Sequence, residues 1–408
     1  MMKKVLLTIL LATPILLFAQ GFQVNLQGQK QSGMAGAGSA LILDESAVFF
    51  NPGAMSMVDH NAISAGMNPL WFKSAFNRSG SNESEYVENH VATPLAAYAI
   101  WGPDQAKWKV GLGVYTPFGG LVDWGDSWSG KYALTSLDLK AIYIQPTFSY
   151  QLTENFGIGA GFVYNHGEVD LQRALPLNYS DSRDAHAQLK GTGKGYGWNA
   201  GLYYRISNGL SIALVHHSKV VTKLNNGNAI FNVPESAASN FPQPNTFNAE
   251  LPLPSTTTLG IGFPINDRTS LALDASFVNW KVYKELAFDY AENTTVLEDT
   301  RSERNYGNGG SIKLGVQHQA TEKFTVRAGA GYVLTPVKEG YVTPEAPDAN
   351  RLMLSAGFGY NINSRWELNG SFLYEDIFSR TQTNIETGLS GTFKTHVFAP
   401  GLSIGYKW

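Results

Sequence analysis

Several residue types in this chain could do chemistry, so we first ask what their spacing allows. Ser127, in the run Gly125-Asp126-Ser127, is a potential nucleophile, but it falls in an expected loop, and the chain has no Gly-x-Ser-x-Gly elbow. The glycine-rich run at 191–195 contains a lysine with no Ser or Thr after it, so it is not a phosphate loop. His216 and His217 are adjacent and, in a strand, would point to opposite faces, so they cannot chelate one metal together. We therefore predict no enzyme activity, no metal site and no cofactor.

Three basic residues stand where they could bind a carboxylate. By strand parity, Arg205, Lys313 and Arg327 lie on faces that carry small and polar residues and would point inward. In a low-dielectric interior, an arginine can bind a carboxylate through two parallel hydrogen bonds. The alternative for each base is a pair with an inward acid, such as Asp274 or Glu367.

The segments that hold these residues alternate with a period of two. In the last strand one face carries large apolar side chains and the other carries small or polar ones: Leu402, Ile404, Tyr406 and Trp408 against Gly401, Ser403, Gly405 and Lys407. The same pattern recurs at 156–164, 198–205, 270–277, 312–317, 324–332 and 366–374. Aromatic residues gather at the ends of the apolar faces, as in the girdles of a membrane β-barrel. A soluble sandwich would also alternate, but without this bias towards the strand ends.

The composition also favours a membrane barrel. Charged residues make up 15% of the chain, below the usual share of about 25%, and there are 42 glycines, 19 tyrosines and 22 phenylalanines. The chain has no cysteine, which excludes disulfides, thiol catalysis and the lipid anchor of a lipoprotein. The net charge of −3 gives no reason to expect a nucleic-acid partner.

The first twenty residues read as an export signal. Lys3 and Lys4 precede an apolar stretch at 5–18, and Ala19 offers a small residue for cleavage. No later segment approaches the roughly 20 apolar residues of a transmembrane helix. Because backbone groups in lipid must pair internally, a closed barrel remains for the mature chain. We expect the outer membrane of a Gram-negative cell as its location.

The connections alternate between short and long. Short turns are expected near 102–107, 151–155, 206–209, 264–268, 319–323 and 361–365. Between them are longer polar or proline-rich loops at 68–92, 117–136, 172–188, 219–253, 282–309, 335–349 and 378–395. Periplasmic turns and extracellular loops alternate in this way. The sequence therefore predicts an all-β fold, an antiparallel transmembrane β-barrel of about fourteen strands at 59–408.

Residues 21–58 do not read as lipid-facing strands. Gly33–Ala40 is a run of small residues, and Asp44–Met55 is a short amphipathic piece that ends in a turn. A segment of about forty residues with this mixture fits a hatch, or plug, inside the lumen. A periplasmic tail is the alternative, but such a tail would be more polar and less aromatic.

This plug segment resembles a known family. The run from Asp44 to Pro52 resembles the N-terminal hatch of FadL-type long-chain fatty acid transporters, whose Asn-Pro-Ala signature stands here as Asn51-Pro52-Gly53. Further matches are Pro117-Phe118-Gly119, the run at 128–132, Pro146 inside the fourth strand, and the closing aromatic residue. The resemblance spans essentially the whole mature chain. The glycine at the third signature position departs from the family and leaves its effect on gating open.

The resemblance implies passive diffusion of hydrophobic molecules through a plugged barrel, with sideways escape at a kinked third strand. The gating residues it implies are Phe49, Phe50, Asn51, Pro52 and Gly53, and the lateral opening is Pro117, Phe118, Gly119 and Gly120. Proline cannot donate to a strand ladder, and paired glycines invite bulges. The alternative is that Pro117 simply ends the strand.

The expected partners follow from the same resemblance. They are long-chain fatty acids or hydrocarbons, outer-membrane lipid and the barrel assembly machinery, and we expect a monomer. Loop 219–253 holds apolar residues that are unusual for an exposed loop and could capture ligand: Phe231, Phe241, Phe247 and Leu251. The alternative is that these residues pack the loops against each other.

Two other functions remain open at this stage. One is a barrel without transport, an adhesin or a structural porin-like protein, whose plug would be rigid. The other is an outer-membrane lipase, which would have no reason to carry a forty-residue plug. Uptake of hydrophobic compounds that depends on residues 21–58 would separate transport from both.

Overall fold

The strands form one antiparallel sheet that closes on itself. The computed structural model describes residues 21–206 and 209–408, so the expected export signal lies outside the described residues. The first strand segment, β1 (Ala62–Met67), pairs with the last, β21 (Ser390–Lys407), which closes the barrel. Several barrel strands are divided into two or three segments, and the described residues make fourteen barrel strands. The predicted fold class is confirmed.

The elements have the following bounds. The short α-helices are α2 (Gln29–Ser32), α3 (Ala47–Phe50) and α4 (Pro52–Met55), and the 3-10 helices are η1 (Glu235–Asn240) and η2 (Trp280–Val282). The strands between β1 and β21 are β2 (Leu70–Arg78), β3 (Ser84–Tyr86), β4 (Val91–Ala92), β5 (Leu95–Trp101), β6 (Trp108–Asp123), β7 (Ser136–Thr153), β8 (Phe156–Asn178), β9 (Asp184–Arg205), β10 (Ser211–His217), β11 (Val220–Asn232), β12 (Asn245–Leu253), β13 (Thr256–Asn266), β14 (Thr269–Val278), β15 (Glu285–Tyr290), β16 (Thr300–Glu303), β17 (Gly309–Gln319), β18 (Phe324–Leu334), β19 (Arg351–Asn361) and β20 (Trp366–Thr383).

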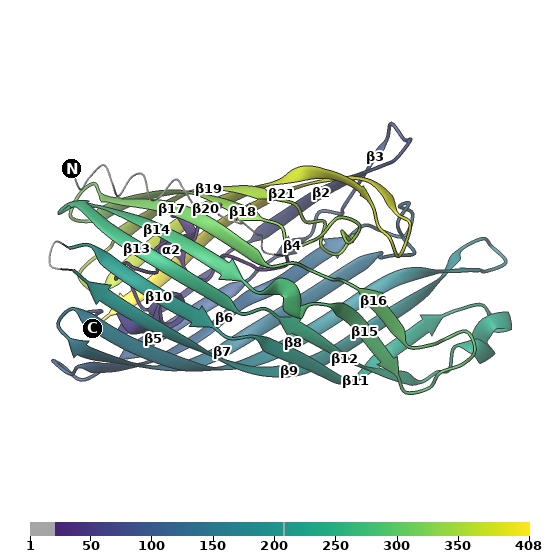
Figure 1. The fold of residues 1–408 in the computed structure, drawn as a ribbon, viewed down its shortest axis with the longest axis horizontal. Coiled ribbons are helices and arrows are strands. Elements are labelled where there is room, and N and C mark those ends of the chain that lie inside the picture. Colours follow the sequence, from purple (N-terminus) through teal and green to yellow (C-terminus); the bar gives the residue numbers. More distant parts are fainter. Residues whose placement is uncertain (1–20, 207–208) are drawn as a thin grey trace.

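The two ends of the barrel differ. The end with the C-terminus carries short turns between consecutive strands, whereas long strand extensions project from the opposite end (Figure 1). The expected short turns near 102–107, 151–155, 264–268, 319–323 and 361–365 lie at the first end, whereas the one near 206–209 falls partly outside the described residues. Short connections at one end and long ones at the other are typical of outer-membrane barrels, which have short periplasmic turns and longer extracellular loops.

The outer wall is apolar and the inner wall is polar. On alternate positions, Phe162, Trp198 and Leu402 are exposed on the outside, with 52%, 51% and 56% of their surface accessible. Polar and charged side chains on the opposite faces are buried inside the barrel, including Asn199 and Asp274. The period-two pattern thus separates a lipid-facing surface from a polar lumen.

The predicted loops are shorter than expected because the strands continue past the membrane. The segment 219–253, expected to be a loop, forms the hairpin of β11 and β12, and β11 also pairs with β9. Likewise, β6 runs through Pro117 to Asp123, so this proline does not end the strand. The extensions bury apolar side chains against one another, and such burial stabilises by about 25 cal/mol for each Å² removed from water.

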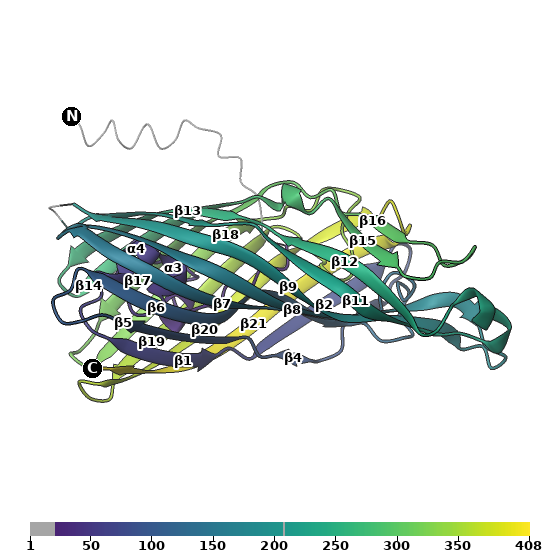
Figure 2. The same cartoon turned by 90° about the horizontal axis from the view of Figure 1, so that it is seen from below.

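The plug lies inside the barrel. Figure 2 shows α3 and α4 behind the barrel wall, towards the end that carries the C-terminus. Among the described residues, no helix is long and apolar enough to cross a membrane. The three short helices of residues 21–58 are almost entirely buried, which agrees with the prediction of a luminal plug.

Candidate functional site

The turn at Asn51 fastens the plug to the barrel wall. The Asn51 side chain accepts a hydrogen bond from the Gly53 amide at 2.9 Å and so caps α4, with Pro52 in the first turn. Its amide nitrogen donates to the carbonyl of Ser39 in the plug, at 3.0 Å, and to that of Leu202 in β9, at 3.2 Å. One buried side chain therefore joins the helix, the rest of the plug and the wall.

Glycines in the barrel wall pack closely against this turn. We call Gly157, Gly159 and Gly201, from β8 and β9, the glycine cradle. A Cβ on Gly157 would lie 2.1 Å from the Gly53 oxygen, and one on Gly159 would lie 2.3 Å from the Pro52 oxygen. A Cβ on Gly53 would itself lie 2.6 Å from the Gly201 oxygen. Glycine at the third signature position therefore permits a backbone-to-backbone contact that alanine would prevent.

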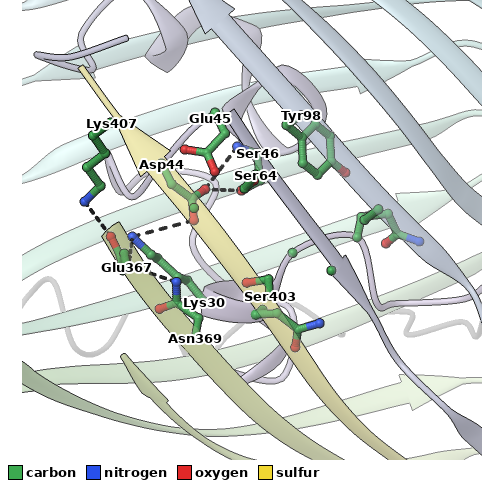
Figure 3. Close-up of a pocket in the computed structure, with 16 residues that line it drawn as sticks. Lys30, Asp44, Glu45, Ser46, Ser64, Tyr98, Glu367, Asn369, Ser403 and Lys407 are labelled. Carbon is green, nitrogen blue, oxygen red and sulfur yellow. Dashed lines mark hydrogen bonds and ion pairs between the residues drawn. The ribbon is translucent and has the colours of Figure 1, made fainter. Parts of the chain in front are cut away.

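An ion network ties the plug to the last strands of the barrel (Figure 3). Lys30 of α2 lies 2.7 Å from Glu367 of β20 and 3.7 Å from Asp44 of the plug. Glu367 also pairs with Lys407 of β21. Lys30 and Glu367 are each 6% exposed, so their charges depend on each other rather than on water.

Removing the Lys30 charge should loosen the plug. In Lys30→Met, Asp44 loses its cation and Glu367 keeps only Lys407, and loss of one partner of a buried pair costs about 3–5 kcal/mol. We expect the low end of that range, because Lys407 remains. The measurement is the urea concentration at which protease cuts residues 21–58 while the barrel keeps its folded electrophoretic mobility.

The control for Lys30→Met is Lys223→Met. Lys223 also pairs with a carboxylate, Glu250 at 2.9 Å, but its side chain is 62% exposed. Solvent-exposed pairs are worth about 0–1 kcal/mol, so this variant should leave the midpoint nearly unchanged. Equal midpoints for both variants would show that the buried network does not hold the plug.

The wall is interrupted at the third barrel strand. The ladder between β5 and β6 stops at the pair Ala96–Tyr115, and a register irregularity follows in the pairing of β6 with β7, between Tyr115 and Phe118. Beyond it, β7 is the only barrel strand that pairs with β6, within the described residues. The backbones meet again where the Glu88 amide donates to the Asp123 carbonyl at 2.7 Å. We call the interval between residues 91–95 and 116–122 the wall gap.

The beginning of the plug pairs with the inner side of this kink. The Val24 amide donates to the Pro117 carbonyl at 2.9 Å, and the Gly119 amide donates to the Phe22 carbonyl at 3.2 Å. These bonds flank an antiparallel bridge between Gln23 and Phe118. At the kink, the N-terminal segment at 21–26 thus pairs with the edge of β6 that β5 leaves.

A cavity of about 540 Å³ lies at the wall gap. Its lining comes from both edges of the gap, from the N-terminal segment 21–26 and from the inner faces of β20 and β21. Two expected opening residues, Gly119 and Gly120, line it. A cavity of this size is within the range of small-molecule sites.

The expected gating and opening residues meet in a second, smaller cavity of about 80 Å³. Phe49 and Phe50 of the plug line it together with Pro117 and Phe118 of the kink. The Phe49 ring lies 4.9 Å from that of Tyr115, between the centroids. The structure therefore brings together two groups of residues that are separated by more than sixty positions in the sequence.

The expected capture residues lie further out and pack against one another. Phe231, Phe241, Phe247 and Leu251 are all buried, and the Phe231 and Phe241 rings lie 5.3 Å apart. Leu251 also lines an apolar cavity of about 70 Å³, which shares Phe22 and Gly120 with the larger one. This agrees more closely with the alternative of loop packing for the phenylalanines, whereas Leu251 also borders a cavity beside the one at the wall gap.

The three predicted bases are not brought together. Arg205 is exposed near a short turn and donates to the Glu154 carbonyl. Lys313 is buried and contacts Asn25 of the plug at 3.2 Å. Arg327 donates to two side chains of the wall, Gln317 at 2.8 Å and Asn369 at 3.2 Å. None of the three lines the cavity at the wall gap.

Two functional groups were not predicted from the sequence. The pairing of residues 22–24 with the kink has no signal in composition or periodicity. The glycine cradle did leave a signal in the sequence, because glycines repeat on the inner faces of two adjacent strands. As expected, the adjacent histidines diverge: His217 meets Phe49 of the plug at 4.7 Å, whereas His216 meets Trp198 at 5.2 Å.

Comparison with known proteins gives one family. The profile described as outer membrane protein transport protein (OMPP1/FadL/TodX) matches residues 10–407. A 47 kDa outer membrane protein of Pasteurella multocida is 26% identical, over 96% of this chain and 94% of that protein. A long-chain fatty acid transport protein of Salmonella typhi is 25% identical, over 85% of each chain.

Solved structures share the fold. A FadL homologue of Pseudomonas aeruginosa superposes with a TM-score of 0.83 at 20% identity, over 95% of this chain and 99% of the other. The toluene transporter TodX of Pseudomonas putida gives a TM-score of 0.71 at 15% identity, over 93% and 97%. At these identities the likeness concerns the architecture, a barrel with the same overall course of the chain.

Proposed function

The chain belongs to the outer membrane transport protein family (OMPP1/FadL/TodX), and we propose that it carries long-chain fatty acids or other hydrophobic compounds passively inward, with a lateral exit at the wall gap. Family membership makes it an outer-membrane channel for hydrophobic compounds without enzymatic activity. Related proteins are named for different cargoes, long-chain fatty acids in one and toluene in another. The route we propose leads through the wall gap, and the gate is the N-terminal segment 21–26.

One observation carries the proposal: the cavity at the wall gap is lined both by the interrupted wall and by the N-terminal segment 21–26. A hydrophobic molecule in a closed polar barrel would have to enter water to leave along the axis, which costs about 25 cal/mol for each Å² of apolar surface. An exit through the wall delivers it to lipid instead. The N-terminal segment 21–26 closes this exit from inside in the present arrangement.

The plug is suited to a gating role. Its start is held at the kink by two backbone hydrogen bonds and by Phe22, whose ring lies 6.4 Å from that of Phe118 and 4.8 Å from that of Trp280, between centroids. Its middle is held by the Asn51 turn, the glycine cradle and Lys30. We infer that residues 21–26 move when a hydrophobic ligand enters, while the remainder of the plug stays seated.

Filling the cavity from the wall should block transport in proportion to side-chain size. Gly120 lines both the cavity at the wall gap and the apolar cavity beyond it, and a Cβ there would meet no atom within 4 Å. We therefore expect uptake to fall in the order Gly120→Ala, Gly120→Leu, Gly120→Trp. For tryptophan the loss should reach about tenfold, which corresponds to about 1.4 kcal/mol.

The measurement is the initial rate of uptake of a labelled hydrophobic compound into cells that lack other transporters of this family. Surface amount and heat-modifiable mobility of each variant serve as folding controls. Undiminished uptake by a folded Gly120→Trp barrel would contradict the lateral route, because the substituted side chain would stand in it.

A further inference from the structure

The cavity at the wall gap is apolar over most of its lining. Phe22 and Leu26 contribute from the N-terminal segment, Leu121 and Leu139 from the kinked wall, and Leu373 from β20. These side chains suit a hydrocarbon body. The few ionisable groups among them decide whether the cavity can accept a ligand whose other end is charged.

The ionisable groups of the lining are mainly acidic. They comprise four acids and two bases: Asp138, Glu345, Asp348 and Glu375, with Lys140 and Arg351. Both bases are paired. Arg351 lies 2.6 Å from Asp348 and 2.9 Å from Glu375, so two carboxylates share one guanidinium. These three side chains are buried, with 3–6% of each residue exposed.

The second base lies at the outer mouth. Lys140 pairs with Asp138 at 2.8 Å, and both stand on the face of β7 opposite the buried Ala141. Glu345 is held by Arg304, which lies behind the lining, at 2.6 Å. Every base on the described lining thus already forms an ion pair with an acid.

The route from the outside has the same character. The adjoining apolar cavity of about 70 Å³ is bordered by Glu168, Glu250 and Glu345 and by a single base, again Lys140. Two of these acids are themselves paired, Glu345 with Arg304 and Glu250 with Lys223 at 2.9 Å. Because Lys140 pairs with Asp138, an anion on this route meets no unpaired base among the described lining residues.

From this charge pattern we propose that the cavity at the wall gap takes an uncharged hydrophobic molecule, a hydrocarbon, alcohol or ester, rather than the anion of a fatty acid. The inference rests on the transport function proposed above and names the class of its substrate. A carboxylate moved from water into this lining would lose its hydration and find no unpaired cation. It would have to break the Arg351 pairs, which leaves a buried carboxylate uncompensated.

The test compares two probes of equal length, dodecan-1-ol and dodecanoate, with the full chain in lipid nanodiscs at pH 8. Labelled ligand bound to empty nanodiscs is subtracted. We expect the alcohol to bind at least about tenfold more tightly than the anion. Equal or tighter binding of dodecanoate would overturn the inference and leave the transport function standing. Failure of both probes to bind, or binding unaffected by Gly120→Trp, would overturn the transport site itself.

Variants that release the guanidinium sharpen the test. Asp348→Asn with Glu375→Gln should raise dodecanoate affinity at least about tenfold and leave dodecan-1-ol binding within about twofold, because Arg351 becomes available to an anion. Glu375→Gln alone gives a smaller shift in the same direction and serves where the double variant does not fold. Asp181→Asn removes an acid from an exposed pair with Arg183 and is the matched control.

Lys140→Gln examines the one partly exposed base. If dodecanoate binds weakly because no cation is free, this variant leaves the ratio of the two affinities unchanged. A selective loss of dodecanoate affinity would show that the carboxylate meets Lys140 at the mouth, and it would overturn the inference.

Discussion

Replacing Gly157 and Gly159 together by alanine should unseat the plug and make the barrel leak small hydrophilic solutes. The two new Cβ atoms would fall 2.1 Å and 2.3 Å from the carbonyl oxygens of Gly53 and Pro52. Neither neighbour is the free end of a flexible side chain. Overpacking of this kind costs about 1–3 kcal/mol at each site, and here both costs fall on the same turn.

The Asn51 turn cannot escape this clash by a small shift. Its side chain is bound to the Ser39 and Leu202 carbonyls, so moving the turn also breaks these hydrogen bonds. Buried groups left without partners cost about 1–3 kcal/mol each. The barrel strands gain only methyl groups and keep their ladders, so assembly of the barrel should be preserved.

The readout is conductance of single barrels in a planar bilayer, with sugar permeation into liposomes as a second measure. The matched control is Gly405→Ala in β21, where a Cβ would meet its nearest atom at 3.8 Å. This control should stay closed. A double variant that folds and remains as closed as the control would show that the plug does not depend on the glycine cradle.

The barrel was predictable because its signal is local. Alternation within each strand, as in 401–408, fixes which face meets lipid, and turn residues fix where strands end. The strand extensions were not predicted. In 219–253, prolines and asparagines gave the appearance of a loop, although Phe231 and Phe247 pack on one side of a hairpin.

The contacts of the site could be predicted only in part. The residues at 49–53 and 117–120 were singled out separately, but their meeting depends on how the plug lies in the closed barrel. Parity placed Lys313 and Arg327 inside, yet it could not name their partners, because these lie on other segments, Asn25 in the plug and Gln317 on a neighbouring strand. Arg351, which lines the cavity, is the first residue of β19, where the period-two pattern is too short to assign it a face.

A reversible cross-link between the N-terminal segment and the kink should block transport, with a large expected effect on uptake. Gln23 and Phe118 form an antiparallel bridge with hydrogen bonds on both sides, the pairing type in which Cα atoms lie about 4.5 Å apart. That separation is within the range of disulfides. The chain has no cysteine of its own, so Gln23→Cys with Phe118→Cys offers one defined cross-link.

Uptake by this double-cysteine variant, compared in oxidised and reduced proteoliposomes, tests most directly whether the N-terminal segment gates the wall gap. The two single-cysteine variants control for the lost side chains and for the redox treatment. We predict that oxidation lowers uptake at least about tenfold, equivalent to about 1.4 kcal/mol, and that reduction restores the rate of the single variants. A fully cross-linked barrel that transports as fast as the reduced one would contradict the account.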